Sequence, residues 1–310
     1  MLVKNPPVEI AENLLMLATN EYPLFLYKGA REGTIFEGGV GAMGPLVIQQ
    51  LGELNIDPEF VTQVVVTHAH PDHVMAVPML RKAFGQVTVL ASKTAADTLA
   101  AEKAVAFFQK VDGMFTQSLT KAGVITEAHH PAPLAEPRIA IERTIEEGDS
   151  VAVDDGVSFA VLETPGHSKC SLSFHQPEAG ILIISDATGY YLPRNDFWWP
   201  NYFSGYQKYL DSMRRLQELN AEVLCLSHNG VVKGAEDVQS YFSGAILATE
   251  NYHRRIIDEA GSGRPAPQIA EQLGAEVYER TQLLPLEFFQ KNCSVLVKQS
   301  LRHEGLAAGE

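Results

Sequence analysis

The stretch Thr67-His68-Ala69-His70-Pro71-Asp72-His73 places three histidines and a carboxylate within six residues, directly after a β-branched run. His68 and His70 are two positions apart, so in extended backbone both side chains project to the same side. The proline then turns the chain, which lets Asp72 and His73 face a second ion next to the first. Imidazole and carboxylate groups are ligands that suit zinc, iron or manganese. The stretch therefore predicts a metal site where a strand ends.

Three further residues of ligand type follow strand-like segments in the same way. His167 lies in Thr164-Pro165-Gly166-His167, and Asp186 and His228 each come just after an apolar, strand-sized run. Ligand sites collect at such strand ends in open sheets. A pair of metal ions about 3.5–4 Å apart needs a bridging carboxylate, and Asp186 is the one available. Five histidines and two aspartates are thus expected to form one site, because burying so many ionisable groups is costly without metal.

Composition and charge exclude several classes of protein. The chain has 310 residues, 45% of them hydrophobic, and a formal net charge of −14, which would repel a nucleic acid backbone. No apolar run reaches the length of a membrane span, and the first residues do not resemble a signal peptide. Three widely spaced cysteines, Cys170, Cys225 and Cys293, argue against a disulfide framework. We therefore expect a cytoplasmic protein that binds neither nucleic acid nor membrane.

The order of strand and helix patterns predicts the architecture. Strand and helix signals alternate in the first half, with an Ala/Lys/Gln-rich helical insert near residues 95–125. A second set of strands follows between residues 150 and 226, and the chain is mainly helical beyond residue 235. We expect an α/β (α+β) sandwich of two sheets with helices outside. Its domains would be residues 1–235, which carry the site, and a helical C-terminal extension, residues 236–310, which covers it.

The motifs together resemble the metallo-β-lactamase superfamily in their order and context. The His-x-His-x-Asp-His run, Thr-Pro-Gly-His, the later aspartate and the last histidine span residues 23 to about 230. The resemblance implies a four-layer αββα sandwich that binds two divalent ions, zinc, iron or manganese. It also implies which residues bind each ion: His68, His70 and His167 would bind one, Asp72, His73 and His228 would bind the other, and Asp186 would bind both.

Within the superfamily the chain is similar to two groups of thioesterases. Pro23–Gly39, the helical insert and Ser185–Gly189 resemble the quinolone-signal response thioesterases, which act on 2-aminobenzoylacetyl-CoA, and glyoxalase II is also similar. The likeness implies a metal-dependent hydrolase that cleaves an acyl or aroyl thioester by attack of a metal-bridging hydroxide. Asp72 would orient that hydroxide and move its proton. Tyr190 stands where the quinolone enzymes have a glutamate shortly after the bridging aspartate, and is a candidate donor to the oxyanion.

Other functions remain open at this level. A lactonase would use the same seven ligands on a cyclic ester, and a persulfide dioxygenase would use one iron on three of the histidines. A non-enzymatic regulator would hold a metabolite without turning it over, although seven intact ligands exceed what binding alone requires. The expected partner is a small-molecule ester or thioester, and the C-terminal helices could support a homodimer. The aromatic stretch Phe197–Phe203 fits a packed loop and a substrate wall equally well.

Overall fold

The structure is a computed structural model that describes residues 2–306, and its contacts divide the chain into two compact units. The first unit contains the chain up to Glu163 together with Cys170–Ser185 and Ala221–Val238. The second unit contains Thr164–Lys169, Asp186–Asn220 and the chain from Gln239 onward. The second unit thus holds more than the C-terminal helices, because two segments from the strand-rich part of the sequence also belong to it.

One sheet of the first unit has seven strands in the order β1-β16-β15-β12-β11-β10-β9. The strands are β1 (Leu2–Val3), β9 (Ser150–Asp154), β10 (Val157–Glu163), β11 (Leu172–Gln176), β12 (Ile181–Ile183), β15 (Val223–Cys225) and β16 (Val231–Lys233). Strands β12 and β15 are parallel, so the residues that follow them leave the sheet at the same edge. The other pairs in this sheet are antiparallel. This parallel pair positions the segments that lead to Asp186 and His228.

The other sheet also has seven strands, in the order β2-β3-β4-β5-β6-β7-β8. They are β2 (Val8–Ala11), β3 (Leu14–Ala18), β4 (Pro23–Lys28), β5 (Gly33–Phe36), β6 (Val61–Val65), β7 (Thr88–Ala91) and β8 (Arg143–Thr144). Strands β5, β6, β7 and β8 run parallel to one another, whereas the pairs from β2 to β5 are antiparallel. Every residue of β5 is buried, and so is every residue of β4 except Lys28, as expected for strands that are covered on both faces.

The core of the first unit lies between these two sheets. Phe25, Phe36 and Val65 from one sheet pack in a single buried cluster with Phe159 and Phe174 from the other. The rings of Phe36 and Phe159 are 4.8 Å apart, and those of Phe36 and Phe174 are 5.2 Å apart. Aromatic and β-branched side chains from both inner faces thus fill the sandwich, which fixes the positions of the strand ends.

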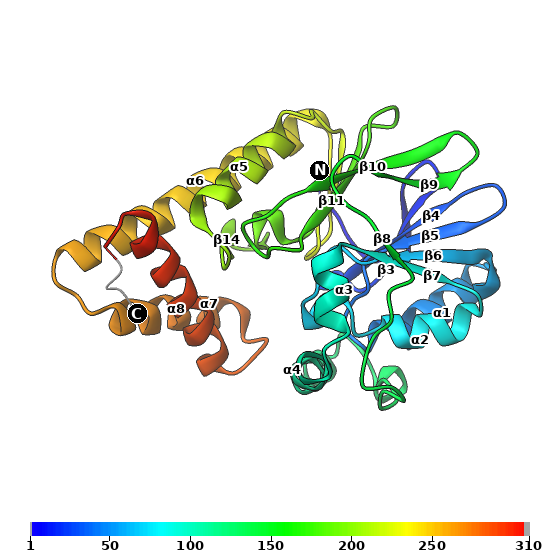
Figure 1. Ribbon diagram of the computed structural model, residues 1–310, viewed down its shortest axis with the longest axis horizontal. Coiled ribbons are helices and arrows are strands. Elements are labelled where there is room, and N and C mark those ends of the chain that lie inside the picture. The colour runs from blue at the N-terminus through cyan, green and yellow to red at the C-terminus, as the bar shows by residue number, and fades with distance from the viewer. Residues whose placement is uncertain (1, 307–310) are drawn as a thin grey trace. The chain divides into compact units, whose positions relative to one another are not determined.

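The helices of the first unit are α1 (Met43–Glu53), α2 (Val77–Phe84), α3 (Lys93–Leu99) and α4 (Glu102–Lys121). Helices α1 and α2 contact strands β3 and β6 and cover one face of the β2–β8 sheet (Figure 1). The helical insert expected near residues 95–125 corresponds to α3 and α4. Helix α4 also contacts the short 3-10 helix η2 (Pro71–His73), so the insert packs beside the histidine-rich stretch. The other 3-10 helices of this unit are η1 (Pro58–Phe60) and η3 (Glu127–His129).

The second unit consists mainly of helices. It contains η4 (Asp186–Thr188), the strand pair β13 (Tyr190–Leu192) and β14 (Phe197–Trp199), and the helices α5 (Tyr206–Gln217), most of α6 (Ala235–Gly261), α7 (Ala266–Thr281) and α8 (Leu286–His303). Helices α7 and α8 pack against each other (Figure 1). Among residues 2–306, no helix has both the length and the apolar character needed to cross a membrane.

The aromatic stretch Phe197–Phe203 mostly packs inside the second unit. The Trp199 ring lies 5.4 Å from Phe289 of α8, and the Trp198 ring lies 5.8 Å from Tyr241 of α6. The guanidinium of Arg280 on α7 sits 4.6 Å above the Phe197 ring. The stretch therefore joins three C-terminal helices, which is the packing role left open by the sequence.

Candidate metal centre

The histidine-rich stretch forms a compact cluster in the first unit. The backbone is extended at His70, and Pro71 then starts η2, whose first turn closes with the His73 amide donating to the His70 carbonyl at 3.0 Å. This change from strand to turn aims successive side chains at different parts of the cluster. The His68 ring lies 4.6 Å from His70 and 4.1 Å from His73, centroid to centroid. His68 and His73 are buried, whereas His70 is half-buried.

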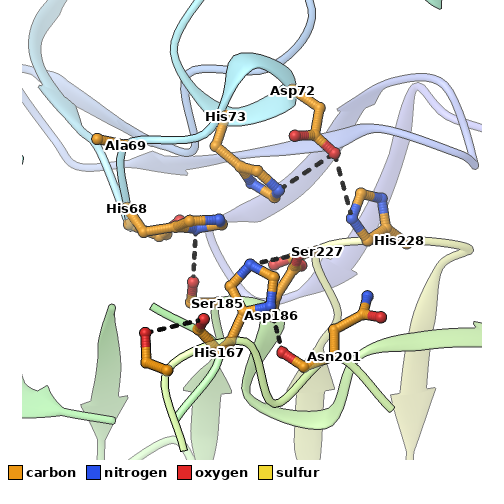
Figure 2. Close-up of polar contacts among 12 residues, drawn as sticks. His68, Ala69, Asp72, His73, His167, Ser185, Asp186, Asn201, Ser227 and His228 are labelled. Atoms are coloured by element: carbon orange, nitrogen blue, oxygen red, sulfur yellow. Dashed lines mark hydrogen bonds and ion pairs between the residues drawn. The ribbon is translucent and has the colours of Figure 1, made fainter. Parts of the chain in front are cut away.

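Asp72, His73 and His228 form a group that could hold a metal ion. Asp72 Oδ2 lies 3.6 Å from His73 Nε2 and 3.8 Å from His228 Nε2, so the carboxylate stands between the two imidazoles (Figure 2). The three ligand atoms all lie within 4.8 Å of one another. The two imidazoles are almost fully buried, and the Asp72 side chain is 18% exposed. The structure thus brings together three of the residues expected from the sequence.

His228 is positioned by a tight turn between β15 and β16. Asn229 and Gly230 have φ values of 66° and 118°, and a Cβ atom on Gly230 would lie 2.5 Å from the Val3 carbonyl oxygen. Only glycine fits that position without displacing backbone. Tyr22 packs edge-on against the His228 ring, with centroids 5.3 Å apart. The turn and the tyrosine together fix where the imidazole points.

His167 and Asp186 lie in the second unit and face each other. His167 Nε2 is 3.3 Å from Asp186 Oδ2, and both side chains are buried. The loop that carries His167 is held by the Ser204 amide, which donates to the Gly166 carbonyl at 2.8 Å, and by the Ser212 hydroxyl, which donates to the Pro165 carbonyl at 2.7 Å. These bonds connect the loop to the start and middle of α5.

The covalent chain limits how far this second pair can lie from the first unit. Asp186 directly follows Ser185, whose Oγ lies 2.8 Å from His68 Nδ1 (Figure 2). The loop Thr164–Lys169 lies between the last residue of β10 and the segment that leads into β11, and both of these belong to the first unit. Both segments thus leave the sheet of the first unit within a few residues of the ligand they carry.

In four of the five histidines, Nδ1 contacts another group of the protein, which leaves Nε2 as the nitrogen that could bind a metal. The Nδ1 atoms of His228 and His167 donate to the backbone carbonyl oxygens of Glu21 and Asn201 at 2.9 and 3.0 Å. A carbonyl only accepts, so both rings carry their proton on Nδ1 and keep the Nε2 lone pair for a metal. His68 Nδ1 meets the Ser185 hydroxyl and His73 Nδ1 meets a carboxylate. Such outer partners orient metal-binding imidazoles, so the donor set fits a divalent transition ion.

Glu37 is a buried partner of the cluster that the sequence did not single out as a site residue. Its Oε2 lies 2.5 Å from His73 Nδ1, and its side chain is only 2% exposed. Glu37 follows β5 with a φ of 83°, and a Cβ atom on the next residue, Gly38, would lie 2.5 Å from the His73 carbonyl oxygen. Glycine there lets the strand end approach η2 closely. A charged residue that ends an otherwise apolar strand, followed by two glycines, is the signal that could have found it.

Replacing Glu37 tests its role as the residue that orients His73. We expect Glu37→Gln to weaken zinc binding by about 10–100-fold, because the partner of a ligating imidazole loses its charge. Competition against a chromophoric chelator would measure the affinity. Glu32→Gln is the matched control, since the Glu32 carboxylate accepts from the Thr62 hydroxyl at 2.8 Å near the start of the neighbouring strand. Equal zinc affinity in Glu37→Gln and the wild type would exclude this role.

Asp112 is a second buried carboxylate that the sequence did not single out. It lies on α4, and its Oδ1 accepts a hydrogen bond from the Gly41 amide at 2.7 Å. Its pKa is raised to about 6, because burial and, to a smaller extent, the negative charge of Asp72 raise it by more than the hydrogen bond from Gly41 lowers it. Asp112 thus connects the helical insert to the loop between Glu37 and α1.

This raised pKa predicts a pH-dependent stability for the metal-free protein. The folded state binds the Asp112 proton more tightly than the unfolded chain does, so stability is lost as pH rises from about 4 to above 6. The loss amounts to about 3 kcal/mol, from about 1.4 kcal/mol per pKa unit. Asp112→Asn lacks this titration, so its free energy of unfolding should improve relative to wild type by that amount over the same range. Urea unfolding at pH 4 and pH 7 measures this difference, and parallel pH profiles would contradict it.

Tyr190 begins β13 and is buried in the second unit. Its backbone pairs with Trp199 of β14. The neighbouring Gly189 has a φ of 71°, and a Cβ atom there would lie 2.4 Å from the Trp199 carbonyl oxygen, so only glycine fits. The segment after Asp186 is therefore tightly held. The role of Tyr190 as a hydrogen-bond donor to the oxyanion stays a proposal.

Known proteins resemble this chain in sequence. The family model of the metallo-beta-lactamase superfamily matches residues 24–228. A hydroxyacylglutathione hydrolase from Cereibacter sphaeroides is 28% identical over 165 residues, which cover 53% of this chain and 46% of that protein. The match thus spans about half the length of that curated relative.

Solved structures show the same fold. A metallo-beta-lactamase family protein from Thermus thermophilus has a TM-score of 0.65 at 19% identity, covering 96% of this chain and 95% of its own. A subclass B3 metallo-beta-lactamase from Bradyrhizobium japonicum has a TM-score of 0.58 at 16% identity, covering 84% and 97%. The expected α/β sandwich with C-terminal helices is confirmed, and the chain belongs to the metallo-beta-lactamase superfamily.

Proposed function

We propose that this metal-dependent hydrolase cleaves thioesters of small acyl or aroyl groups in the cytoplasm, using two divalent ions. The observation that carries the proposal is the Asp72–His73–His228 group, with its imidazole tautomers fixed by outer partners. A one-iron enzyme would have no use for this second group, which is why we favour hydrolysis over persulfide oxidation. The relative that acts on hydroxyacylglutathione supports a thioester rather than a lactone.

The seven ligand-type residues would divide between the two ions as their positions suggest. We propose that His68, His70 and His167 hold one ion, that Asp72, His73 and His228 hold the other, and that Asp186 contacts both. The short covalent links from Ser185 to Asp186 and from β10 to His167 support this assembly. When bound, the ions would supply a water molecule that ionises near neutral pH and would polarise the substrate carbonyl.

Two side chains of the protein would transfer the proton and stabilise the developing negative charge. Asp72 is the ligand-type residue with a partly exposed carboxylate, so this carboxylate would accept a proton from the attacking water and pass it to the leaving sulfur. Thiolates are good leaving groups, so a strong acid is not needed. Tyr190 would donate its phenolic hydrogen to the oxygen that gains charge as the carbonyl carbon becomes tetrahedral.

Hydrolysis assays on metal-depleted and zinc-, iron- or manganese-loaded protein test this function. Acyl-CoA, aroyl-CoA and acylglutathione thioesters would be offered beside a lactone of similar size. We expect cleavage of thioesters only after metal loading, with release of the free thiol. Lactone cleavage without thioester cleavage would contradict the proposed substrate class. No turnover by the fully loaded protein on any of these compounds would contradict a hydrolase and favour a binding protein.

A further inference from the structure

A second cluster of ligand-type side chains lies within the second unit. His253 comes from the middle of α6, His303 ends α8, and Glu304 follows directly as the C-terminal cap of α8. One ligand atom from each of the three lies within 4.8 Å of the others. None of these residues belongs to the seven described above. The cluster lines a pocket with a volume of about 460 Å³, which Tyr206 and Arg214 also line.

The spacing of the three side chains suits a small divalent ion. His253 Nε2 is 3.2 Å from Glu304 Oε1, and His303 Nε2 is 4.0 Å from the same oxygen. Ligand atoms around tetrahedral zinc, at bond lengths of about 2.0–2.1 Å, lie about 3.3 Å apart. The first pair already has this separation. The side chain of His303 is 35% exposed at the end of its helix, so a turn of its ring can close the second distance.

The surroundings prepare His253 to act as a neutral ligand. The Tyr206 ring stacks on it at 3.9 Å with an interplanar angle of 17°, which holds the imidazole in one orientation. Burial lowers the pKa of His253, while the Glu304 carboxylate raises it and the neighbouring His303 lowers it. A neutral imidazole is the form that binds metal. His253 Nε2 is the nitrogen that faces Glu304, so this atom would bind the ion and Nδ1 would keep its proton.

The charges around the pocket also favour a cation. Three carboxylates, Glu250, Asp258 and Glu304, face two guanidiniums, Arg214 and Arg254, in its lining. Arg214 already pairs with Glu250 at 2.8 Å, which neutralises one of the cations. With neutral histidines, the lining therefore carries a net negative charge. Two imidazoles and one carboxylate form a donor set that zinc takes with a water molecule in the fourth position.

We propose that His253, His303 and Glu304 form a third zinc site, separate from the two ions of the catalytic centre, which links α6 to the end of α8. The His303 ring also packs edge-on against Tyr206 and His253, with centroids 4.9 and 5.4 Å apart. Metal binding would use this side chain as a third ligand beside His253 and Glu304. The site would hold the C-terminus of α8 against α6 and would take a divalent ion of zinc-like chemistry.

Zinc stoichiometry tests the proposal without relying on activity. Full-length, metal-depleted protein would be dialysed against buffered free zinc and analysed for zinc per chain. We expect His303→Asn and Glu304→Gln each to bind one equivalent less than the wild type. Asp258→Asn removes a carboxylate of the same pocket that is not a proposed ligand, and should keep the wild-type number. His303 and Glu304 are partly exposed, so these variants should fold, and circular dichroism would verify this.

The outcomes separate this site from the catalytic one. Three equivalents in the wild type and two in the His303→Asn and Glu304→Gln variants would support both sites. One equivalent in the wild type and none in these variants would support the third site while contradicting the dinuclear centre. Equal numbers in the wild type and all variants would overturn the third site, whatever the hydrolytic activity.

Discussion

Thioester hydrolysis should fall by about 10³-fold when Asp72 is replaced by alanine, within the range of about 10²–10⁴ that a positioned acid or base contributes. The substitution removes the carboxylate that stands between the Nε2 atoms of His73 and His228, and with it the proposed proton carrier. Steady-state kinetics on a zinc-loaded variant would measure the loss, and kcat should carry most of it.

The control for this variant is Asp97→Ala. Asp97 is an exposed residue of α3, where it pairs with Lys93 at 3.0 Å on the same helix. Exposed pairs of this kind contribute little, so this variant should retain wild-type kinetics. If Asp72→Ala kept a kcat within a few-fold of the wild type at full zinc loading, Asp72 would be excluded as the proton carrier.

Gly166→Ala should destabilise the protein by about 3 kcal/mol or more. Gly166 has a φ of +130°, and a Cβ atom there would lie 2.3 Å from Tyr209 Cα and 2.5 Å from Tyr209 N. Strained backbone costs about 1–3 kcal/mol and overpacking costs about as much again, and backbone atoms of α5 cannot turn away as a side chain would. The adjacent His167 would be displaced with the loop, so zinc affinity should fall as well.

Thermal and urea unfolding of Gly166→Ala and Gly113→Ala would measure this effect. Gly113 lies inside α4 and has no heavy atom within 4 Å of its ideal Cβ position, so alanine there should be neutral or stabilising by up to about 1 kcal/mol. A loss of stability smaller than about 1 kcal/mol in Gly166→Ala would show that α5 does not pack tightly on the His167 loop.

Local chemistry made much of the fold predictable. The histidine-rich stretch follows a β-branched strand, and the strands around it have the apolar runs of a covered sheet, so β4, β5 and β6 were identifiable. Apolar residues recur at helical spacing from Val74 to Phe84, but α2 begins only at Val77, after η2 and a three-residue turn. Because the apolar residues have the same spacing in this turn and in α2, the sequence pattern did not show where α2 begins.

What escaped prediction depends on contacts between distant segments. Glu37 becomes important only because β5 and η2 meet, 36 residues apart in the chain. The carbonyl groups of Glu21 and Asn201, which fix the tautomers of His228 and His167, are backbone atoms that no residue type announces. Strands β13 and β14 were also unexpected. Their aromatic residues pack against α6, α7 and α8 and do not alternate with polar residues as in a typical strand.

The most direct test of the dinuclear centre is anomalous diffraction at the zinc absorption edge from crystals of the full-length protein soaked with zinc. We expect two peaks a few ångströms apart, one bound by Nε2 of His68, His70 and His167 and the other by Asp72, His73 and His228. A single peak, or none at these residues in crystals that bind zinc elsewhere, would contradict a dinuclear centre.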